Sequence, residues 1–363
     1  MHLAYLRLRD FRNYGRLDAD FEPGFHLLLG DNAQGKTNIL EAIYLIATLR
    51  SFRGVGGAPM IRHGQKGYFV GAKIVSQGEH EVKMYWSAQE RSLSLDGRPV
   101  QKLTDYLGVL RTVVFCTEDL QLVKGPARAR RRFMDLLLSQ THSTYLPLLQ
   151  RYTQALRARN ALLRQPIVDP VALEGFSREL VRAGDEIIRL RRELVPRFSP
   201  LAQEAHHRIS AGAEALRLEY QPSVKSDFTT ELAQSAARER SYRSTVIGPH
   251  RDDLQLLLAD RAAAQFGSEG QKRTLAIALK MAQADYVTGI HSAPPVLLID
   301  DIMGELDAKR RAGFLPLLER AHQARGQVFM TATEANWPED LAQESLGWRV
   351  ERGTLVKQAG SSG

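Results

Sequence analysis

Residues Gly30–Thr37 read Gly-Asp-Asn-Ala-Gln-Gly-Lys-Thr, which matches the phosphate-loop pattern G-x-x-x-x-G-K-[ST] without a mismatch. The apolar run Phe25–Leu29 precedes the loop and predicts a buried strand, and Asn38–Ile46 follows with apolar residues at helical spacing. Strand, glycine loop and helix form the context in which backbone N–H groups bind phosphate. The nucleotide-binding residues we predict are Gly30, Asp31, Asn32, Ala33, Gln34, Gly35, Lys36, Thr37 and Asn38.

A second motif supplies carboxylates for the same site. Val296–Ile299 predicts a strand buried on both faces, and Asp300 and Asp301 follow it. Lys36 is expected to reach the β- and γ-phosphates, and the Thr37 hydroxyl and Asp300 to hold Mg²⁺. Asp301 is expected to orient the attacking water as general base. Taken alone, the segment is explained equally well by a strand followed by an acidic turn.

A third motif resembles the signature loop of ABC-type ATPases. Gly267–Gln271 opens a long helical stretch shortly before the acidic strand. In ABC ATPases this loop completes the nucleotide pocket of a partner subunit, a role that would fall here to Ser268, Gly270 and Gln271. A plain capping box of Ser268 and Gln271 explains the same residues. By their order after the acidic strand, Asp307 takes the D-loop position and Thr333 the switch position, where His is usual.

Six further segments are similar to the RecF family of bacterial recombination mediator ATPases, and together they span nearly the whole chain. They are Leu8–Tyr14, Asn38–Ile43, Arg50–Arg53, Phe115–Leu120, Arg130–Phe133 and Gly248–Asp253. Gly304, where the family usually has Ser, and Glu269, in a usually less acidic loop, depart from the pattern.

The resemblance implies a function and a set of partners. It implies ATP and Mg²⁺ as cofactors, a head-to-tail homodimer formed on ATP, and a weak DNA-stimulated ATPase. It implies double-stranded DNA and single/double-strand junctions as ligands, RecR as partner and RecA indirectly, in DNA repair, DNA replication and the SOS response. It also implies a cytoplasmic, nucleoid-associated protein. Arg12 is expected to contact the nucleotide, as its equivalent does in Rad50-like heads.

Composition agrees with this interpretation without requiring it. The 363 residues are 44% hydrophobic, and the net charge is +8 with a pI near 9.6. A basic balance is weak evidence for nucleic acid. The single Cys excludes an intrachain disulfide and suits a reducing compartment. The N-terminus is not a signal peptide, and no uncharged apolar run reaches membrane length.

The predicted fold is an α/β ABC-type P-loop ATPase head, similar to SMC heads, with an inserted compact α-helical lobe. The head is discontinuous, 1–120 plus 245–363, and the lobe is 121–244. Helical periodicity covers 127–164, 173–192 and 201–218. Prolines at 166, 170, 196 and 200 are expected to cut these helices. An SMC-like head with a long arm is disfavoured, because the insert is short. A binding module in which ATP only joins two subunits stays open.

Arginine dominates the basic residues of the lobe. Arg130, Arg131 and Arg132 are predicted to contact the DNA backbone, since Arg gives bidentate, permanently charged phosphate contacts. A solvated helix face with internal ion pairs, or a structural role beside Phe133, explains the cluster as well. His206 and His207 have no third ligand at a suitable spacing, so we expect them on a helix surface.

Overall fold

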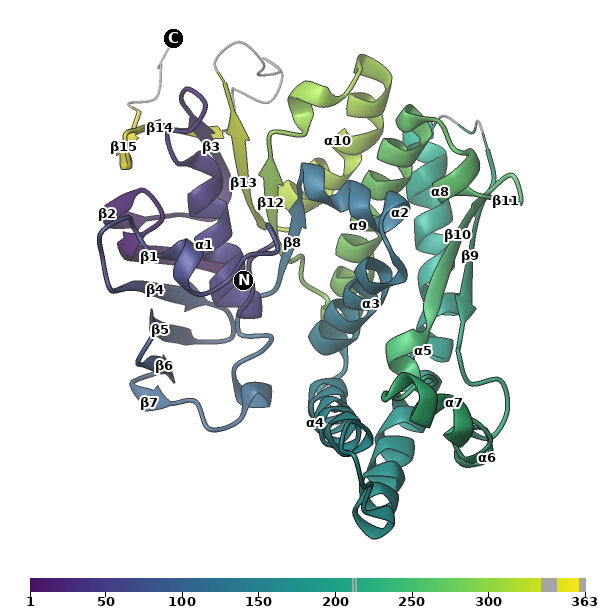
Figure 1. Cartoon of the computed structure of the whole chain (residues 1–363). Helices are drawn as coiled ribbons and strands as arrows, with labels where there is room; N and C mark the ends of the chain where they lie inside the picture. The colour runs from purple at the N-terminus through teal and green to yellow at the C-terminus, as the bar shows by residue number, and fades with distance from the viewer. Residues whose placement is uncertain (211, 213, 334–344, 359–363) are drawn as a thin grey trace. The chain divides into compact units, whose positions relative to one another are not determined.

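The structure is a computed structural model, and it describes residues 1–363 except 211, 213, 334–344 and 359–363 (Figure 1). The chain divides into two compact units. Unit 1 comprises Met1–Asp119, Ala205–Gly212 and Ala276–Gly363, and unit 2 comprises Leu120–Glu204 and Ala213–Leu275. The first boundary lies within one residue of the predicted one. The return to the head lies at 275/276 rather than at 244/245, so the signature loop belongs to unit 2.

Unit 1 contains an antiparallel sheet of six strands, in the order β2-β1-β4-β5-β6-β7. Their bounds are β1 His2–Phe11, β2 Tyr14–Asp20, β4 Gly67–Val75, β5 Glu79–Ser87, β6 Arg91–Leu95 and β7 Arg98–Pro99. Buried and more exposed residues alternate along β2, as in a sheet with one face toward solvent. Strands β4 and β5 form one antiparallel hairpin, and β6 and β7 form another through the turn at Asp96 and Gly97.

The second sheet of unit 1 carries the phosphate loop. Its order is β15-β14-β3-β13-β12-β8, parallel throughout except for the antiparallel pair β14–β15. The bounds are β3 Gly24–Leu29, β8 Thr112–Phe115, β12 Val296–Asp300, β13 Gln327–Ala332, β14 Ser345–Glu351 and β15 Thr354–Lys357. Strands β3, β12 and β13 are buried on both faces, as their uninterrupted apolar runs predict.

Helices cover both faces of the parallel sheet. Helix α1 (Lys36–Thr48) packs against this sheet and against β4 of the antiparallel one. On the other face, α10 (Ala308–Gln323) and the part of α9 (Glu269–His291) after residue 275 form one core with Phe25, Phe115 and Ile299. The buried amide of Gln327 joins the two sheets, because it bonds both backbone groups of Leu3.

Unit 2 is largely helical. Its helices are α2 Gln121–Lys124, α3 Ala127–Thr141, α4 Tyr145–Leu163, most of α5 Pro170–Ser210, α6 Phe228–Gln234, α7 Ala236–Tyr242, α8 Ala263–Phe266 and the start of α9. The short 3-10 turns η1–η5 cover 58–60, 103–105, 117–120, 249–251 and 303–305. No helix in the described part of the chain is long and apolar enough to cross a membrane.

Two predictions about the lobe are wrong. Pro196 and Pro200 lie inside α5, which continues to Ser210. A proline in a helix interior costs about 3 kcal/mol, but the buried stripe Leu194, Phe198, Ala202, Ala205 and Ile209 runs past both prolines and outweighs that cost. His206 is also buried rather than on the surface.

The lobe also contains a small sheet, and its first strand begins inside the stretch 201–218 that was predicted as helix. Residues 216–221 form β9 (Leu216–Gln221), which pairs with β10 (Asp253–Leu258), and β10 pairs with β11 (Arg261–Ala262). The alternation of Leu216, Leu218 and Tyr220 fits a period of two, and the pairing with β10 decides between strand and helix. This pairing also holds 213–275 in unit 2, beyond the predicted boundary.

A buried arginine joins the elements of unit 2. Arg191 on α5 is 2% exposed and donates to Asp135 Oδ1 at 2.7 Å and to Asp252 Oδ2 at 3.0 Å. It also donates to the Pro249 carbonyl oxygen at 2.8 Å. The segment Gly248–Asp253 therefore contributes buried polar contacts that connect α5 to α3 and to the start of β10.

We predict that Arg191→Ala lowers the free energy of unfolding of unit 2 by about 3–5 kcal/mol, because it leaves buried carboxylates without their cation. Arg189→Ala, two residues away on the same helix, removes an exposed arginine paired with Glu186 and Glu193 and should cost about 0–1 kcal/mol. Thermal and urea unfolding measure both. Equal losses in the two variants would contradict the structural role of Arg191.

Candidate functional site

The phosphate loop connects β3 to α1 and has glycine where its backbone requires it. Gly30 has φ +150°, and a Cβ there would lie 2.3 Å from the Val350 carbonyl oxygen. Gly35 has φ +117°, and a Cβ there would lie 2.5 Å from Asn13 Nδ2. Both fixed glycines of the motif thus allow a close approach of neighbouring segments.

The turn between β1 and β2 holds the loop from one side. Asn13 Nδ2 donates to the Gln34 carbonyl oxygen at 2.7 Å, and the Tyr14 hydroxyl donates to the Gly35 carbonyl oxygen at 3.1 Å. Asn38 Nδ2 on α1 donates to Asn13 Oδ1 at 2.8 Å. The conspicuous Asn-Tyr pair after Phe11-Arg12 therefore fixes the end of the loop before Lys36.

The turn between β14 and β15 holds the same residue from the other direction. Arg352 N donates to Gln34 Oε1 at 2.7 Å, and Gly353 N donates to the Gln34 carbonyl oxygen at 3.3 Å. No motif in the sequence predicts this role of the hairpin. The Arg352-Gly353 pair predicts a turn, but it does not predict that the turn contacts Gln34.

Lys36 points into the loop. Its Nζ donates to the carbonyl oxygens of Gly30 at 2.6 Å and Asp31 at 2.9 Å. Burial lowers the pKa of the ammonium group, while the carboxylates of Asp301 and Asp300 act in the opposite direction. The cation therefore lies at the start of α1, inside the loop and near two acidic side chains, as the motif predicts.

Asp300 lies at the centre of a hydrogen-bond cluster. The hydroxyls of Thr37 and Thr331 donate to Asp300 Oδ1 at 2.8 and 2.9 Å, and Asp301 N donates to Thr331 Oγ1 at 2.9 Å. Burial raises the pKa of Asp300 above its ordinary range, opposed by the two hydroxyl bonds and reinforced by the charges of Glu118 and Asp301. The structure thus brings the two predicted metal ligands, Thr37 and Asp300, together.

Asp301 differs from Asp300 in its surroundings. It is exposed and has a left-handed backbone with φ +55°, which turns it out of the strand direction just after β12. Asp tolerates this conformation better than most residues. The pair therefore presents one buried carboxylate beside Thr37 and one exposed carboxylate next to it.

Sequence reasoning missed two residues at this sheet edge. Thr331 bridges Asp300 and Asp301, although Thr333 was the predicted residue of that segment. Glu118 follows β8, which runs parallel to β12 with Phe115 opposite Ile299, and its charge raises the pKa of Asp300. The signal for Glu118 was an apolar strand followed by acids, the same pattern that identified Asp300.

Arg12 is engaged with another residue. Its guanidinium donates to both carboxylate oxygens of Glu41 at 2.8 and 2.7 Å and to the Pro59 carbonyl oxygen at 2.7 Å. Glu41 lies on α1 and is fully buried. Arg12 thus anchors the first turns of α1, and its contact with a nucleotide stays a prediction.

The signature loop forms a capping box at the start of α9. Ser268 N donates to Gln271 Oε1 at 2.6 Å, and Gln271 N donates to Ser268 Oγ at 3.2 Å. The capping box of Ser268 and Gln271, predicted as the alternative to a signature loop, is therefore present in the structure. That Ser268, Gly270 and Gln271 complete the nucleotide pocket of a partner subunit stays a prediction.

The remaining predicted residues also have clear local positions. Asp307 caps α10 by accepting a hydrogen bond from Arg310 N at 2.8 Å. Thr333 follows directly after β13 and is half-buried. The D-loop and switch roles stay predictions.

The predicted DNA-binding arginines differ from one another. Arg130 makes a bidentate pair with Asp253 at 2.7 and 2.8 Å, and Arg131 donates to the Asp252 carbonyl oxygen at 2.6 Å. Both belong to unit 2 and hold α3 to the start of β10. The contacts of Arg130 and Arg131 therefore fit the alternative that these arginines have a structural role. The side chain of Arg132 is exposed.

The donor set fits a magnesium nucleotide better than a free-standing metal site. The described residues contain no group of three or more His, Cys, Asp or Glu side chains that could hold a metal ion. Mg²⁺ in nucleotide sites takes one or two protein oxygens and fills its octahedron with phosphate oxygens and water. Thr37 Oγ1 and Asp300 Oδ1, 2.8 Å apart, match that requirement.

The chain is similar to known proteins over nearly its whole length. The model of the RecF/RecN/SMC N terminal domain matches residues 2–354. The chain is 37% identical to the DNA replication and repair protein RecF of Symbiobacterium thermophilum, and the match covers 98% of each chain. It is 27% identical to a solved structure of the recombination mediator protein RecF-ATP in the RecFOR pathway, with a TM-score of 0.89 over 99% of this chain and 98% of that one.

A more distant comparison concerns the fold alone. The Smc head domain of Pyrococcus furiosus, solved with an extended coiled coil and the C-terminal domain of ScpA, is 16% identical over 99% of this chain and 96% of that one, with a TM-score of 0.59. The predicted ABC-type ATPase head, related in fold to SMC heads, is confirmed.

We predict that Asp300→Asn raises the melting temperature of the protein at neutral pH in the absence of nucleotide and metal. Because burial raises the folded-state pKa of Asp300, its ionised form costs stability above that pKa, and this cost disappears below the ordinary value of 3.8. The gain should therefore shrink as the pH falls through this window. Asp20→Asn, an exposed acid in unit 1, controls for the lost charge. A gain that does not change with pH would refute the explanation.

Proposed function

The chain belongs to the RecF family of DNA replication and repair proteins, and from this premise we propose that it is an ATP-dependent DNA-binding clamp and recombination mediator. The observation that carries the proposal is the 2.8 Å hydrogen bond from Thr37 Oγ1 to Asp300 Oδ1. It joins the phosphate loop to an acidic strand end 263 residues away, as a magnesium-nucleotide site requires.

ATP is the ligand we propose for the loop. Backbone N–H groups of the loop and the N-terminus of α1 would bind the phosphates, and Lys36 Nζ would exchange its bonds to Gly30 and Asp31 for the β- and γ-phosphates. Mg²⁺, when bound between Thr37 and Asp300, would neutralise charge on the phosphates. The solved structure of RecF-ATP, to which this chain is similar, supports this choice of ligand.

Hydrolysis is proposed to be slow and stimulated by DNA. Asp301 is exposed one residue beyond Asp300, so its carboxylate is free to orient a water for attack on the γ-phosphate. Thr331 accepts from the backbone N–H of Asp301 and from this position holds the Asp301 backbone next to Asp300. A site that used ATP only to join two subunits would not need this second carboxylate.

The active unit we propose is a head-to-tail homodimer with ATP between its subunits. Ser268, Gly270 and Gln271 would face the γ-phosphate bound by the partner, because the hydroxyl and the N-terminal N–H groups of α9 attract an anion. Asp307 and Thr333 would complete the site as D-loop and switch. This arrangement makes hydrolysis depend on dimerisation.

We propose that the ATP-bound dimer binds DNA. The relatives are named for DNA replication and repair, and one is described as part of the RecFOR pathway. We propose double-stranded DNA and single/double-strand junctions as ligands, with RecR as partner and RecA acting downstream, in a cytoplasmic, nucleoid-associated protein. Of the predicted arginine cluster, Arg132 suits a phosphate contact best, because it is exposed.

A matched pair of variants tests binding against chemistry. We predict that Lys36→Met loses ATP affinity, because the loop loses its cation at the phosphates. Asp301→Asn should keep ATP affinity while turnover falls about a hundredfold or more, because only the carboxylate facing the water is removed. Equilibrium binding of labelled ATP and steady-state hydrolysis give both quantities. Unchanged affinity in Lys36→Met, or wild-type turnover in Asp301→Asn, would contradict the assignments.

A mixing experiment tests the composite site. Ser268→Arg should keep ATP binding in the monomer and abolish hydrolysis, because a bulky cation fills the space owed to the partner's γ-phosphate. Mixing Ser268→Arg with Lys36→Met chains should restore hydrolysis up to that of one working site per dimer. Full hydrolysis by Ser268→Arg alone would place the reaction within one subunit and overturn the dimer mechanism.

A further inference from the structure

The outer face of the antiparallel sheet in unit 1 carries charged and aromatic side chains in register. We name this surface the sheet platform. Alternate residues on the same strands, such as Leu6, Val70 and Val82, are buried, so the platform faces solvent. Three cross-strand rows define it: Arg16, Arg9, Phe69, Tyr85 and Ser92; Asp18, Arg7, Gly71, Lys83 and Ser94; and Asp20, Tyr5, Lys73 and Glu81.

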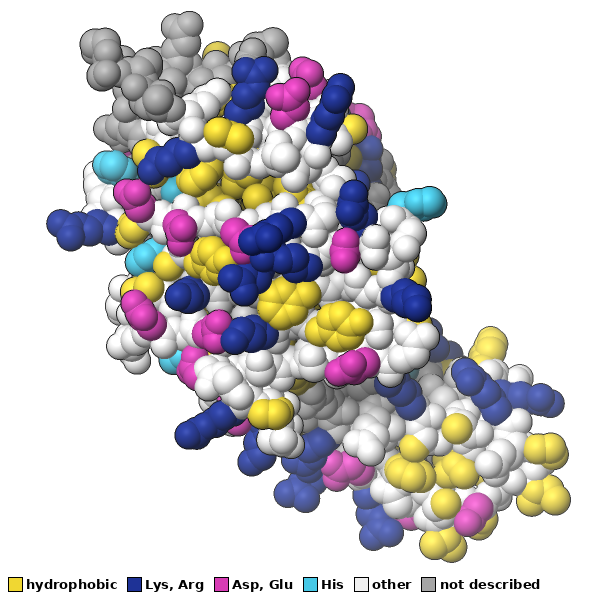
Figure 2. All heavy atoms as spheres, turned by 90° about the vertical axis from the view of Figure 1, so that its left-hand side faces the viewer, with side chains coloured by type: hydrophobic (Ala, Val, Ile, Leu, Met, Phe, Trp, Pro, Cys, Tyr) yellow, Lys and Arg dark blue, Asp and Glu magenta, His cyan; other side chains and the backbone are white. Residues whose placement is uncertain are grey.

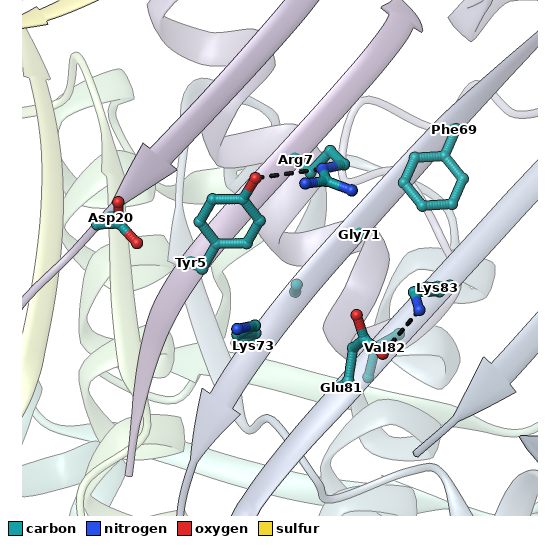
Figure 3. Close-up of a pocket in the computed structure, with 10 residues that line it drawn as sticks. Tyr5, Arg7, Asp20, Phe69, Gly71, Lys73, Glu81, Val82 and Lys83 are labelled. Atoms are coloured by element: carbon teal, nitrogen blue, oxygen red, sulfur yellow. Dashed lines mark hydrogen bonds and ion pairs between the residues drawn. The ribbon is translucent and has the colours of Figure 1, made fainter. Parts of the chain in front are cut away.

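The centre of the platform is hollow. The cavity has a volume of about 360 Å³ and is lined by Tyr5, Arg7, Phe69, Gly71, Lys73 and Lys83 among others. Figure 3 shows the rings of Tyr5 and Phe69 on either side of Gly71, with the lysines beside them. A Cβ at Gly71 would lie 3.0 Å from the Phe69 ring, so the missing side chain keeps the hollow open.

The charge of the platform is predominantly positive. Its three rows hold five Arg or Lys residues and three carboxylates. Arg7, Arg9 and Arg16 all bond the single carboxylate of Asp18, at 2.8 to 3.0 Å, which leaves their combined charge unbalanced. In Figure 2, Lys and Arg side chains gather beside exposed apolar side chains on the side of the molecule that carries this sheet.

Fold stability does not account for this arrangement. Exposed ion pairs contribute about 0–1 kcal/mol each, and a glycine within a strand weakens it. Asp18 instead holds the arginines side by side, and Arg7 lies 5.5 Å from the centre of the Tyr5 ring. Preorganised guanidinium groups next to half-exposed rings are what binding of a nucleotide chain requires, since phosphates need cations and unpaired bases stack on rings.

We propose that the sheet platform is a binding site for single-stranded nucleic acid. Unpaired bases would stack on Phe69 and Tyr85 and enter the hollow over Gly71, and the sugar-phosphate backbone would follow Arg9, Arg7 and Lys83. A duplex cannot use the rings, because its bases are already stacked and paired. This site is separate from the ATP-dependent duplex binding proposed above. One part of the inference rests on that proposed function: the single strand would come from a gap next to a duplex.

The test uses a fluorescein-labelled oligothymidylate of about 15 nucleotides, the full-length protein at low salt, and no ATP. Phe69→Ala should weaken binding about tenfold, because one stacking partner is lost. Phe69→Trp should retain binding. Lys83→Ala should lower the log–log salt slope by about 0.7, the contribution of one phosphate on a single strand. Arg98→Ala is the matched control, because Arg98 is in register with the inward-facing Leu95.

A second measurement covers variants that fold poorly. An oligonucleotide containing 4-thiothymidine should crosslink to peptides from β4 and β5 of the wild-type protein and of Lys36→Met, which separates this site from the ATP-dependent one. Crosslinks elsewhere, equal affinities of wild type and Phe69→Ala, or no binding would overturn the proposal. So would an acidic peptide, or a second copy of the chain, that occupies the face in a Phe69-dependent way while the oligonucleotide does not.

Discussion

The site depends on one constraint, namely that four neighbouring strands of the second sheet run parallel. Because β3, β13, β12 and β8 run in the same direction, their carboxyl ends meet at one sheet edge. That edge carries the phosphate loop, Thr331, the pair Asp300 and Asp301, and Glu118. The strands lie far apart in the sequence, so tertiary pairing, rather than any local motif, assembles the cluster around Asp300 Oδ1.

The parts of the site that follow from local chemistry could be predicted from the sequence. A loop with two required glycines, a cation and a hydroxyl has few other uses. A buried strand ending in acids is ambiguous by itself, but beside such a loop it predicts a metal ligand. Thr331 and the β14–β15 hairpin could not be predicted, because their roles depend on which strands are neighbours. Gln34, bonded from both Asn13 and Arg352, shows how far apart such supporting segments lie.

The arginines mark the limit of sequence reasoning in unit 2. Arg130 and Arg191 look in the sequence like members of basic clusters, but each pairs with a carboxylate from the segment 252–253. Composition cannot distinguish a buried counter-ion from a DNA contact, since both need the same planar, charged group. The prolines of α5 also show the limit of local rules. Proline usually interrupts a helix, but α5 continues through Pro196 and Pro200 because a stripe of its side chains is buried.

The central proposal is that ATP and Mg²⁺, bound at the site in unit 1, cause two copies of the chain to form a homodimer. The most direct test is the molar mass of the protein in solution, measured by light scattering with and without ATP and Mg²⁺. We expect the 40.7 kDa monomer without nucleotide and about twice that mass with it. A mass that stays at the monomer value under saturating ATP, or a dimer that forms equally without it, would contradict the claim.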